Sequence, residues 1–266
     1  MRLGLSSFIY RYAIRGGPGV AKPLTAVDVL GRAAALGAEA VQFCENLPLA
    51  ALPSAEREAL LEASRRLRVG VEIGMRGLNI TALLAHVDLA AAVGSRALRL
   101  VLDATDLEVI HEALRPVLKR CAERQVVLAI ENHFDLRTAA LAELMRRLDD
   151  PWLGVCLDTA NSTGHLEQPT ETLALLRPYV RQVHLKDYAI EKAPIAYRIT
   201  GRPLGRGALD PAAILQAVMG HTPAPDLFLE QWMPADESLE ATLANEQSWV
   251  DASVRTARNY LAAVPR

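Results

Sequence analysis

Short apolar runs alternate with longer amphipathic stretches along the whole chain. The apolar runs predict buried strands near residues 2–8, 39–43, 69–74, 96–102, 126–131, 152–157, 180–185 and 226–230. The stretches between them carry apolar residues at helical spacing and predict helices near residues 25–37, 54–66, 78–94, 106–124, 136–148, 170–177, 210–219 and 238–262. Thr25, Asp106 and Asp210 stand where three of these helices need an N-cap, and Pro211 follows at a first helical position.

The strict alternation of strands and helices predicts an α/β fold, a single (β/α)8 TIM barrel spanning residues 1–266. An open doubly wound sheet is the alternative, but that fold places a glycine fingerprint directly after its first strand. Here GGPG at 16–19 falls in a loop, with no helix N-terminus to hold a phosphate. The stretches 9–23 and 186–209 are longer than typical connections, and we expect both to form lids on the C-terminal side of their strands.

Composition narrows the class of protein further. The formal net charge is −2, and no basic excess indicates a nucleic-acid partner. No apolar stretch is long enough to span a bilayer, and the opening MRLGLSSF lacks the apolar core of a signal peptide, so we expect neither membrane insertion nor secretion. Cys44, Cys121 and Cys156 are widely spaced in apolar surroundings, which predicts core thiols in a reducing cytoplasm.

Four residues with metal-binding side chains stand at or beside the ends of consecutive predicted strands. They are Glu131 in VVLAIENH, Asp158 in WLGVCLDT, His184 in VRQVHLKD and Glu230 in DLFLEQWM. Taken singly, each of these residues is more simply interpreted as a helix cap, a loop residue or, for His184, a core histidine. Because the C-terminal ends of barrel strands meet at one mouth, their coincidence favours a shared site. Three carboxylates and an imidazole suit one hard or borderline divalent cation.

Further polar residues are expected to face the same mouth and bind substrate. Glu45 ends the second strand, and Glu72 is a carboxylate inside the third strand that needs a partner. His133 follows Glu131 closely and either contacts the substrate, to which it could donate a proton, or faces the loop and donates a hydrogen bond to a metal-binding side chain. Lys186 either holds an anionic substrate group or pairs with Asp187 or another carboxylate.

Three more substrate contacts are expected from the loops. Asn161 lies in the loop that follows Asp158. Arg198 and Arg202, in the long loop after the seventh strand, are expected to clamp an anionic group in bidentate fashion.

The motifs LGLSSF, AIENH, GVCLDT, VHLKD, PLGRGALD and LFLEQW resemble, in order, those of the xylose isomerase-like TIM barrels, the sugar phosphate isomerase/epimerase superfamily. The resemblance implies that Glu131, Asp158, His184 and Glu230 hold the metal. Manganese or magnesium is favoured by the carboxylate-rich ligands, with cobalt and zinc as alternatives. The resemblance further implies that Glu131 and Glu230 are catalytic and transfer a proton on a hydroxy-ketone sugar or keto sugar acid. The reaction would pass through an enediolate held by the metal.

Asn161 departs from the epimerase pattern, because many epimerases carry His three residues after the aspartate. The motifs SSFIYRY, VQFCENLPL, LDTANS and GRPLGRGALD are more similar to a subgroup that includes 3-oxo-isoapionate decarboxylases. A β-keto acid that loses CO2 gives the same type of enediolate without a base. Because the resemblance to the isomerase/epimerase superfamily covers nearly the whole chain, we still place isomerase or epimerase chemistry first and decarboxylation of a β-keto sugar acid close behind.

Two other functions compete with these. An apurinic endonuclease would need a histidine-rich metal cluster and a basic surface, whereas this chain has 6 His and a slightly negative charge. A non-catalytic binding barrel would not require four ligands at one rim. The expected partner is a small carbohydrate or sugar acid, and we expect neither nucleic acid nor membrane as a partner. The resemblance further implies that the chain forms homo-oligomers.

Overall fold

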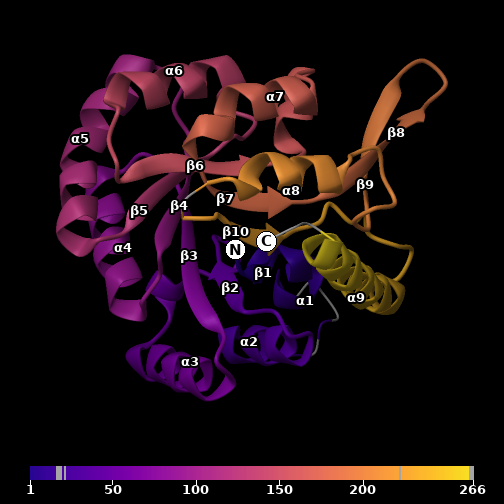
Figure 1. Cartoon of the computed structure of the whole chain (residues 1–266). Helices are drawn as coiled ribbons and strands as arrows, with labels where there is room; N and C mark the ends of the chain where they lie inside the picture. Colours follow the sequence, from indigo (N-terminus) through magenta and orange to yellow (C-terminus); the bar gives the residue numbers. More distant parts are fainter. Residues whose placement is uncertain (16–19, 21, 222, 264–266) are drawn as a thin grey trace.

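A computed structural model of the chain describes residues 1–15, 20, 22–221 and 223–263 (Figure 1). Its parallel strands close into a barrel in the order β1-β10-β7-β6-β5-β4-β3-β2. The barrel strands are β1 Leu3–Ser6, β2 Ala40–Phe43, β3 Gly70–Arg76, β4 Ala97–Val101, β5 Val127–Glu131, β6 Leu153–Asp158, β7 Val180–Leu185 and β10 Asp226–Leu229. This topology confirms the predicted TIM barrel.

Helices cover the outside of the barrel and connect its strands (Figure 1). The principal ones are α2 Ala26–Ala35, α3 Ser54–Leu67, α4 Ile80–Val93, α5 Leu107–Arg124, α6 Thr138–Leu148, α7 Pro169–Leu176, α8 Pro211–Met219 and α9 Leu239–Ala263. Thr25, Asp106 and Asp210 cap α2, α5 and α8 with their side chains, as predicted. Within the described part of the chain, no helix is both long and apolar enough to cross a bilayer.

Both long loops contain structure that the hydrophobic pattern did not predict. After β1 come a 3-10 turn, η1 Ser7–Tyr10, and the short helix α1 Arg11–Arg15. After β7 the chain forms an antiparallel hairpin of β8 Asp187–Lys192 and β9 Tyr197–Arg202, which projects away from the barrel (Figure 1). The remaining short turns are η2 Leu49–Ala51, η3 Asn161–His165 and η4 Arg177–Tyr179. The predicted GGPG loop at 16–19 lies outside the described residues.

A buried carboxylate anchors the base of this hairpin. Asp187 is 1% exposed and accepts hydrogen bonds from the backbone N–H groups of Tyr188, Gly205, Gly207 and Leu209. A Cβ on Gly207 would lie 2.2 Å from Oδ1 of Asp187, so only glycine permits this close approach. The motif PLGRGALD therefore serves to wrap the loop around one carboxylate.

Charged side chains close the opposite, N-terminal end of the barrel. The Arg2 guanidinium binds Asp226, with Nη2 2.6 Å from Oδ2, and also contacts Glu72. Glu72 is fully buried and accepts further hydrogen bonds from Ser95 Oγ at 2.8 Å and Ala97 N at 3.2 Å. The expectation that Glu72 serves the substrate site is therefore wrong. Its position early in β3 places the carboxylate at the floor of the barrel, where Arg2 supplies its partner.

The three cysteines are buried and unpaired, as predicted for core thiols. Burial raises the pKa of both Cys44 and Cys121 to about 12. Their thiols are therefore protonated and unreactive at neutral pH.

The charge network at the barrel floor should contribute to stability in a pH-dependent way. Burial acts to raise the pKa of Asp226, but hydrogen bonds from Arg2 outweigh it and hold the pKa below its ordinary value of 3.8. This stabilisation is therefore present above the unfolded pKa and lost as pH falls through the lower folded pKa. We expect Asp226→Asn to lower the free energy of unfolding at pH 7 by about 1.5–3 kcal/mol, measured by urea denaturation.

The difference between Asp226→Asn and the unmodified protein should shrink as pH falls below 3.8. Asp88→Asn is the matched control, because Asp88 makes an exposed ion pair with Arg124 whose loss should cost less than about 1 kcal/mol. Equal effects of the two substitutions at pH 7 would contradict a special role for the buried network.

Candidate active site

The structure brings the four predicted metal ligands together at the C-terminal mouth of the barrel. Asp158 and His184 are register partners on β6 and β7, Glu131 ends β5, and Glu230 directly follows β10. Nδ1 of His184 lies 2.8 Å from Oε2 of Glu230, 3.3 Å from Oε2 of Glu131 and 4.0 Å from Oδ2 of Asp158. The strands thus aim all four side chains at one point.

This cluster fits a divalent cation. Asp158, His184 and Glu230 each offer one ligand atom, and these atoms lie within 4.8 Å of one another. Oδ2 of Asp158, Nδ1 of His184 and Oε2 of Glu230 are buried and find no hydrogen-bond partner of good geometry among the described residues. Buried polar atoms without partners are costly, and a cation would satisfy all three at once. Burial also raises the pKa of Asp158 to about 6, because the charged carboxylate loses its hydration there.

A glutamine inside the barrel sets the orientation of the histidine ring. Nε2 of His184 lies 2.6 Å from Oε1 of Gln42, and Nε2 of Gln42 donates in turn to Gln182 at 3.0 Å. Because an amide oxygen only accepts, Nε2 must carry the proton, which leaves the lone pair of Nδ1 for a metal. Sequence reasoning missed Gln42, although a fully buried polar residue in the strand AVQF was the available signal.

Arg99 is the second important residue that sequence reasoning missed. It lies on β4, is 3% exposed, and binds Glu131 through Nε and Glu45 through Nη1, the latter at 2.6 Å. Asn161 Nδ2 donates to the other oxygen of Glu131 at 2.8 Å. Burial acts to raise the pKa of Glu131, but Arg99 and His184 outweigh it and hold the pKa below its ordinary value. An arginine inside the strand ALRLV was the signal.

Lys186 is paired with ligand carboxylates. Its ammonium lies 2.8 Å from Oδ2 of Asp158, in a charge contact whose angle falls outside hydrogen-bond geometry, and 3.5 Å from Oε2 of Glu230. It also donates to Oδ1 of Asn161 at 3.3 Å. Of the two roles expected for Lys186, the structure therefore shows pairing with a carboxylate. That carboxylate is Asp158 and not the neighbouring Asp187.

A cavity of about 230 Å³ opens onto this cluster. It is lined by Phe8, Arg11, Glu45, Arg76, Arg99, Val101, Glu131, His133, Phe134, Asn161, Lys186, Glu230, Gln231 and Trp232. Four expected substrate contacts are thus in its wall: Glu45, His133, Asn161 and Lys186. Both predicted lid loops also reach it, the first through Arg11 and the second through Lys186, while residues 16–19 and 21 of the first lie outside the described residues.

The expected clamp of Arg198 and Arg202 is not formed. Arg202 binds Glu191 on the adjacent strand of the hairpin, and Arg198 is exposed on β9. Neither lines the cavity. The expectation was wrong because the loop folds into a hairpin, in which Arg202 pairs across the two strands with Glu191 and Arg198 is exposed to solvent.

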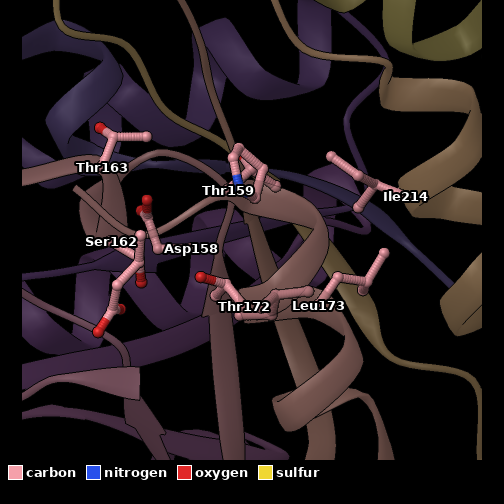
Figure 2. Close-up of a pocket in the computed structure, with 10 residues that line it drawn as sticks. Asp158, Thr159, Ser162, Thr163, Thr172, Leu173 and Ile214 are labelled. Carbon is pink, nitrogen blue, oxygen red and sulfur yellow. The ribbon is translucent and has the colours of Figure 1, made fainter. Parts of the chain in front are cut away.

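A second, much smaller pocket lies between β6, η3, α7 and α8. Figure 2 shows the side chains of Ser162, Thr163 and Thr172 around it, next to Asp158. Its volume of about 10 Å³ leaves room for about one water molecule. It is therefore too small for a sugar, and the larger cavity is the candidate substrate site.

Comparison with known proteins agrees with this geometry. The sequence model described as "Xylose isomerase-like TIM barrel" matches residues 30–253. The 3-oxo-isoapionate decarboxylase of Pectobacterium atrosepticum is 30% identical over 267 residues, which cover 98% of this chain and 95% of that protein. Over its whole length, this chain therefore has an enzyme as a relative.

Solved structures share the fold. A xylose isomerase-like TIM barrel protein from Mycobacterium smegmatis, solved in complex with magnesium, is 18% identical with a TM-score of 0.72, over 96% of this chain and 97% of that one. D-psicose 3-epimerase from Clostridium cellulolyticum H10, solved with D-tagatose, is 12% identical with a TM-score of 0.75, over 98% of this chain and 99% of that one. At these low sequence identities, the similarity shows that the barrel fold is shared and shows nothing further.

We expect chelator-treated protein to bind one divalent ion per chain and to unfold at a higher temperature when manganese is added, because the ion binds only the folded site. Asp158→Asn should weaken binding by at least about tenfold, as loss of a charged ligand demands. Glu108→Gln, an exposed carboxylate on α5, is the control and should change nothing. Isothermal titration and thermal melts measure both effects, and unchanged manganese affinity in Asp158→Asn would contradict the site.

The orientation of His184 gives a separate prediction. Gln42→Leu should weaken metal affinity by about 10–100-fold, because the ring loses the acceptor that fixes its proton on Nε2. Gln182→Leu is the control, since Gln182 contacts Gln42 but not the histidine. If both variants bind manganese equally well in the same titration, Gln42 does not orient the ligand.

Proposed function

The chain belongs to the xylose isomerase-like TIM barrel family, and on that premise we propose that it is a divalent-metal-dependent decarboxylase of a β-keto sugar acid. The full-length relationship to a decarboxylase supports this choice. The main structural support for this choice is the set of hydrogen-bond donors around Glu131. The order of the two reactions is thereby reversed from the one that the sequence favoured.

The observation that best supports decarboxylation is that both carboxylate oxygens of Glu131 accept hydrogen bonds. Arg99 binds one oxygen, and the Asn161 amide binds the other at 2.8 Å. Each oxygen keeps a second lone pair that a metal can use, but the buried Arg99 guanidinium favours the charged carboxylate over the carboxylic acid and so holds the pKa of Glu131 below its ordinary value. Such a carboxylate is suited to ligation and poorly suited to carrying a proton. Decarboxylation needs no base, which makes it compatible with this arrangement.

The remaining residues have roles that follow from their positions. A divalent ion bound at the four ligands would supply a Lewis acid that polarises a ketone oxygen. Lys186 holds Asp158 and Glu230 in place through its charge. His133 lines the cavity without being a ligand, and we assign it the proton that replaces the lost CO2.

Aromatic side chains enclose the reacting part of the substrate. Phe134 and Trp232 stack with their ring centroids 5.9 Å apart, and Phe8 lines the cavity with them. Gly201 lies so close to Trp232 that a Cβ there would fall 2.2 Å from its backbone oxygen. The hairpin therefore buttresses this wall. An apolar wall limits water in the cavity and strengthens the charge interactions within it.

Isomerisation or epimerisation of a keto sugar is the second candidate. The observation in its favour is Glu230, whose Oε2 accepts no hydrogen bond among the described residues. A proton on that oxygen would displace no hydrogen-bond donor, although Lys186 and His184 outweigh the effect of burial and hold the pKa of Glu230 well below its ordinary value. It would act as the sole glutamate base, however, because its counterpart Glu131 is held by two donors.

Incubation with 3-keto sugar acids and with ketoses in deuterated water separates the two reactions. We expect the manganese-loaded protein to release CO2 from the acids and to place one solvent deuteron at the carbon that lost it. The C–H bonds of the ketoses should not exchange, because a site that only releases CO2 abstracts no proton from carbon. Gas analysis and NMR measure these outcomes, with chelated protein as the control for spontaneous decarboxylation. Exchange into ketoses without CO2 release would establish the second candidate instead.

A further inference from the structure

The cavity has two halves of different character. The half formed by β5, β6, β7 and β10 holds the metal ligands. The other half is formed by the ends of β1 to β4 and the residues that follow them, and it contributes Arg11, Glu45, Arg76 and Arg99. A substrate bound at the ligands must therefore extend its remaining atoms toward this second, arginine-rich half.

Most of the cationic groups around the cavity already have carboxylate partners. Arg99 has two partners, as described above. Arg76 Nη2 lies 2.6 Å from Oδ2 of Asp135, and the Lys186 ammonium lies 2.8 Å from Oδ2 of Asp158. These three side chains already have carboxylate partners, Arg99 and Lys186 in buried ion pairs and Arg76 in an exposed one.

Arg11 differs from the other three. It lies at the start of α1, lines the cavity, and is exposed to solvent. Across residues 1–15, 20, 22–221 and 223–263, no carboxylate lies within ion-pair distance of its guanidinium, whose Cζ lies 5.9 Å from the ring centroid of Tyr12. Its hydrogen-bond donors therefore remain available to a ligand.

The total charge also favours an anionic ligand. Four cationic side chains line the cavity with three carboxylates, and the nearby Asp158 and Asp135 bring the carboxylates to five. With a divalent ion bound, these five negative charges face six positive ones. One positive charge is left to be matched by the substrate, and the group that lacks a partner is Arg11.

We propose that Arg11 binds the carboxylate of a sugar-acid substrate and selects such acids over neutral sugars of the same length. A guanidinium offers two parallel N–H donors that match the two oxygens of a carboxylate. The cavity of about 230 Å³ restricts the substrate to a small molecule. This inference rests on the proposed function for the location of the substrate, but it concerns binding and does not depend on which reaction follows.

Binding of inert analogues tests the proposal. Isothermal titration of the manganese-loaded protein would use xylonate, its neutral counterpart xylitol, and the phosphate monoester of xylitol. Xylonate should bind more tightly than xylitol. Arg11→Met should weaken xylonate binding by about 10–100-fold and leave xylitol binding unchanged, as expected for one charge-assisted contact. Arg11→Lys should restore part of the loss.

Arg198→Met is the matched control, because Arg198 is exposed on the hairpin outside the cavity. Full preference for xylonate in Arg11→Met would overturn the proposal, since the carboxylate would then be bound elsewhere, for example directly on the metal. Tighter binding of the phosphate ester than of xylonate would overturn the choice of carboxylate. Selective, Arg11-dependent xylonate binding without any CO2 release would uphold this inference while refuting the proposed decarboxylase.

Discussion

The structure of the site depends on one constraint: three carboxylates are buried side by side at the mouth of the barrel. Glu131, Asp158 and Glu230 all lie within 4.0 Å of the same imidazole nitrogen. Buried like charges repel strongly in a medium of low dielectric constant, so each must be matched by a cation. Arg99 matches Glu131, and Lys186 lies between the other two. The divalent ion that we infer completes this balance.

We infer that the same balance bears on the chemistry of this site. One set of ligands could support proton transfer or CO2 release, because both reactions can pass through the same type of enediolate. In our proposal, the choice between them depends on how firmly the neighbouring residues hold each ligand carboxylate. In this chain Arg99 and Asn161 occupy both oxygens of Glu131, whereas Oε2 of Glu230 is free of hydrogen bonds among the described residues. The asymmetry between the two glutamates is the chemical signature of this site.

Two sets of buried polar residues therefore lie at opposite ends of one barrel and serve different purposes. At the floor, Arg2, Glu72 and Asp226 satisfy one another and leave no open position. At the mouth, one ligand atom each of Asp158, His184 and Glu230 makes no hydrogen bond among the described residues, and Glu131 and Glu230 line a cavity. Since both sets consist of acidic and basic residues in apolar strands, they look alike in the sequence. Only their position along the strand, and the partners that this position offers, separates structural from functional charge.

The sequence by itself determined the barrel, its strand and helix boundaries to within a few residues, and the four residues that meet at its mouth and that we propose as metal ligands. Hydrophobic periodicity reports directly which backbone is buried, and parallel strands in strict alternation allow few topologies. The tertiary structure alone decided that Arg99 and Gln42 hold the ligands and that Glu72 does not, because a partner from another strand is invisible in local sequence. It also decided that Arg202 lies on a hairpin outside the cavity. The direction of a side chain in a long loop depends on pairing with residues far along the chain, and no local pattern encodes it.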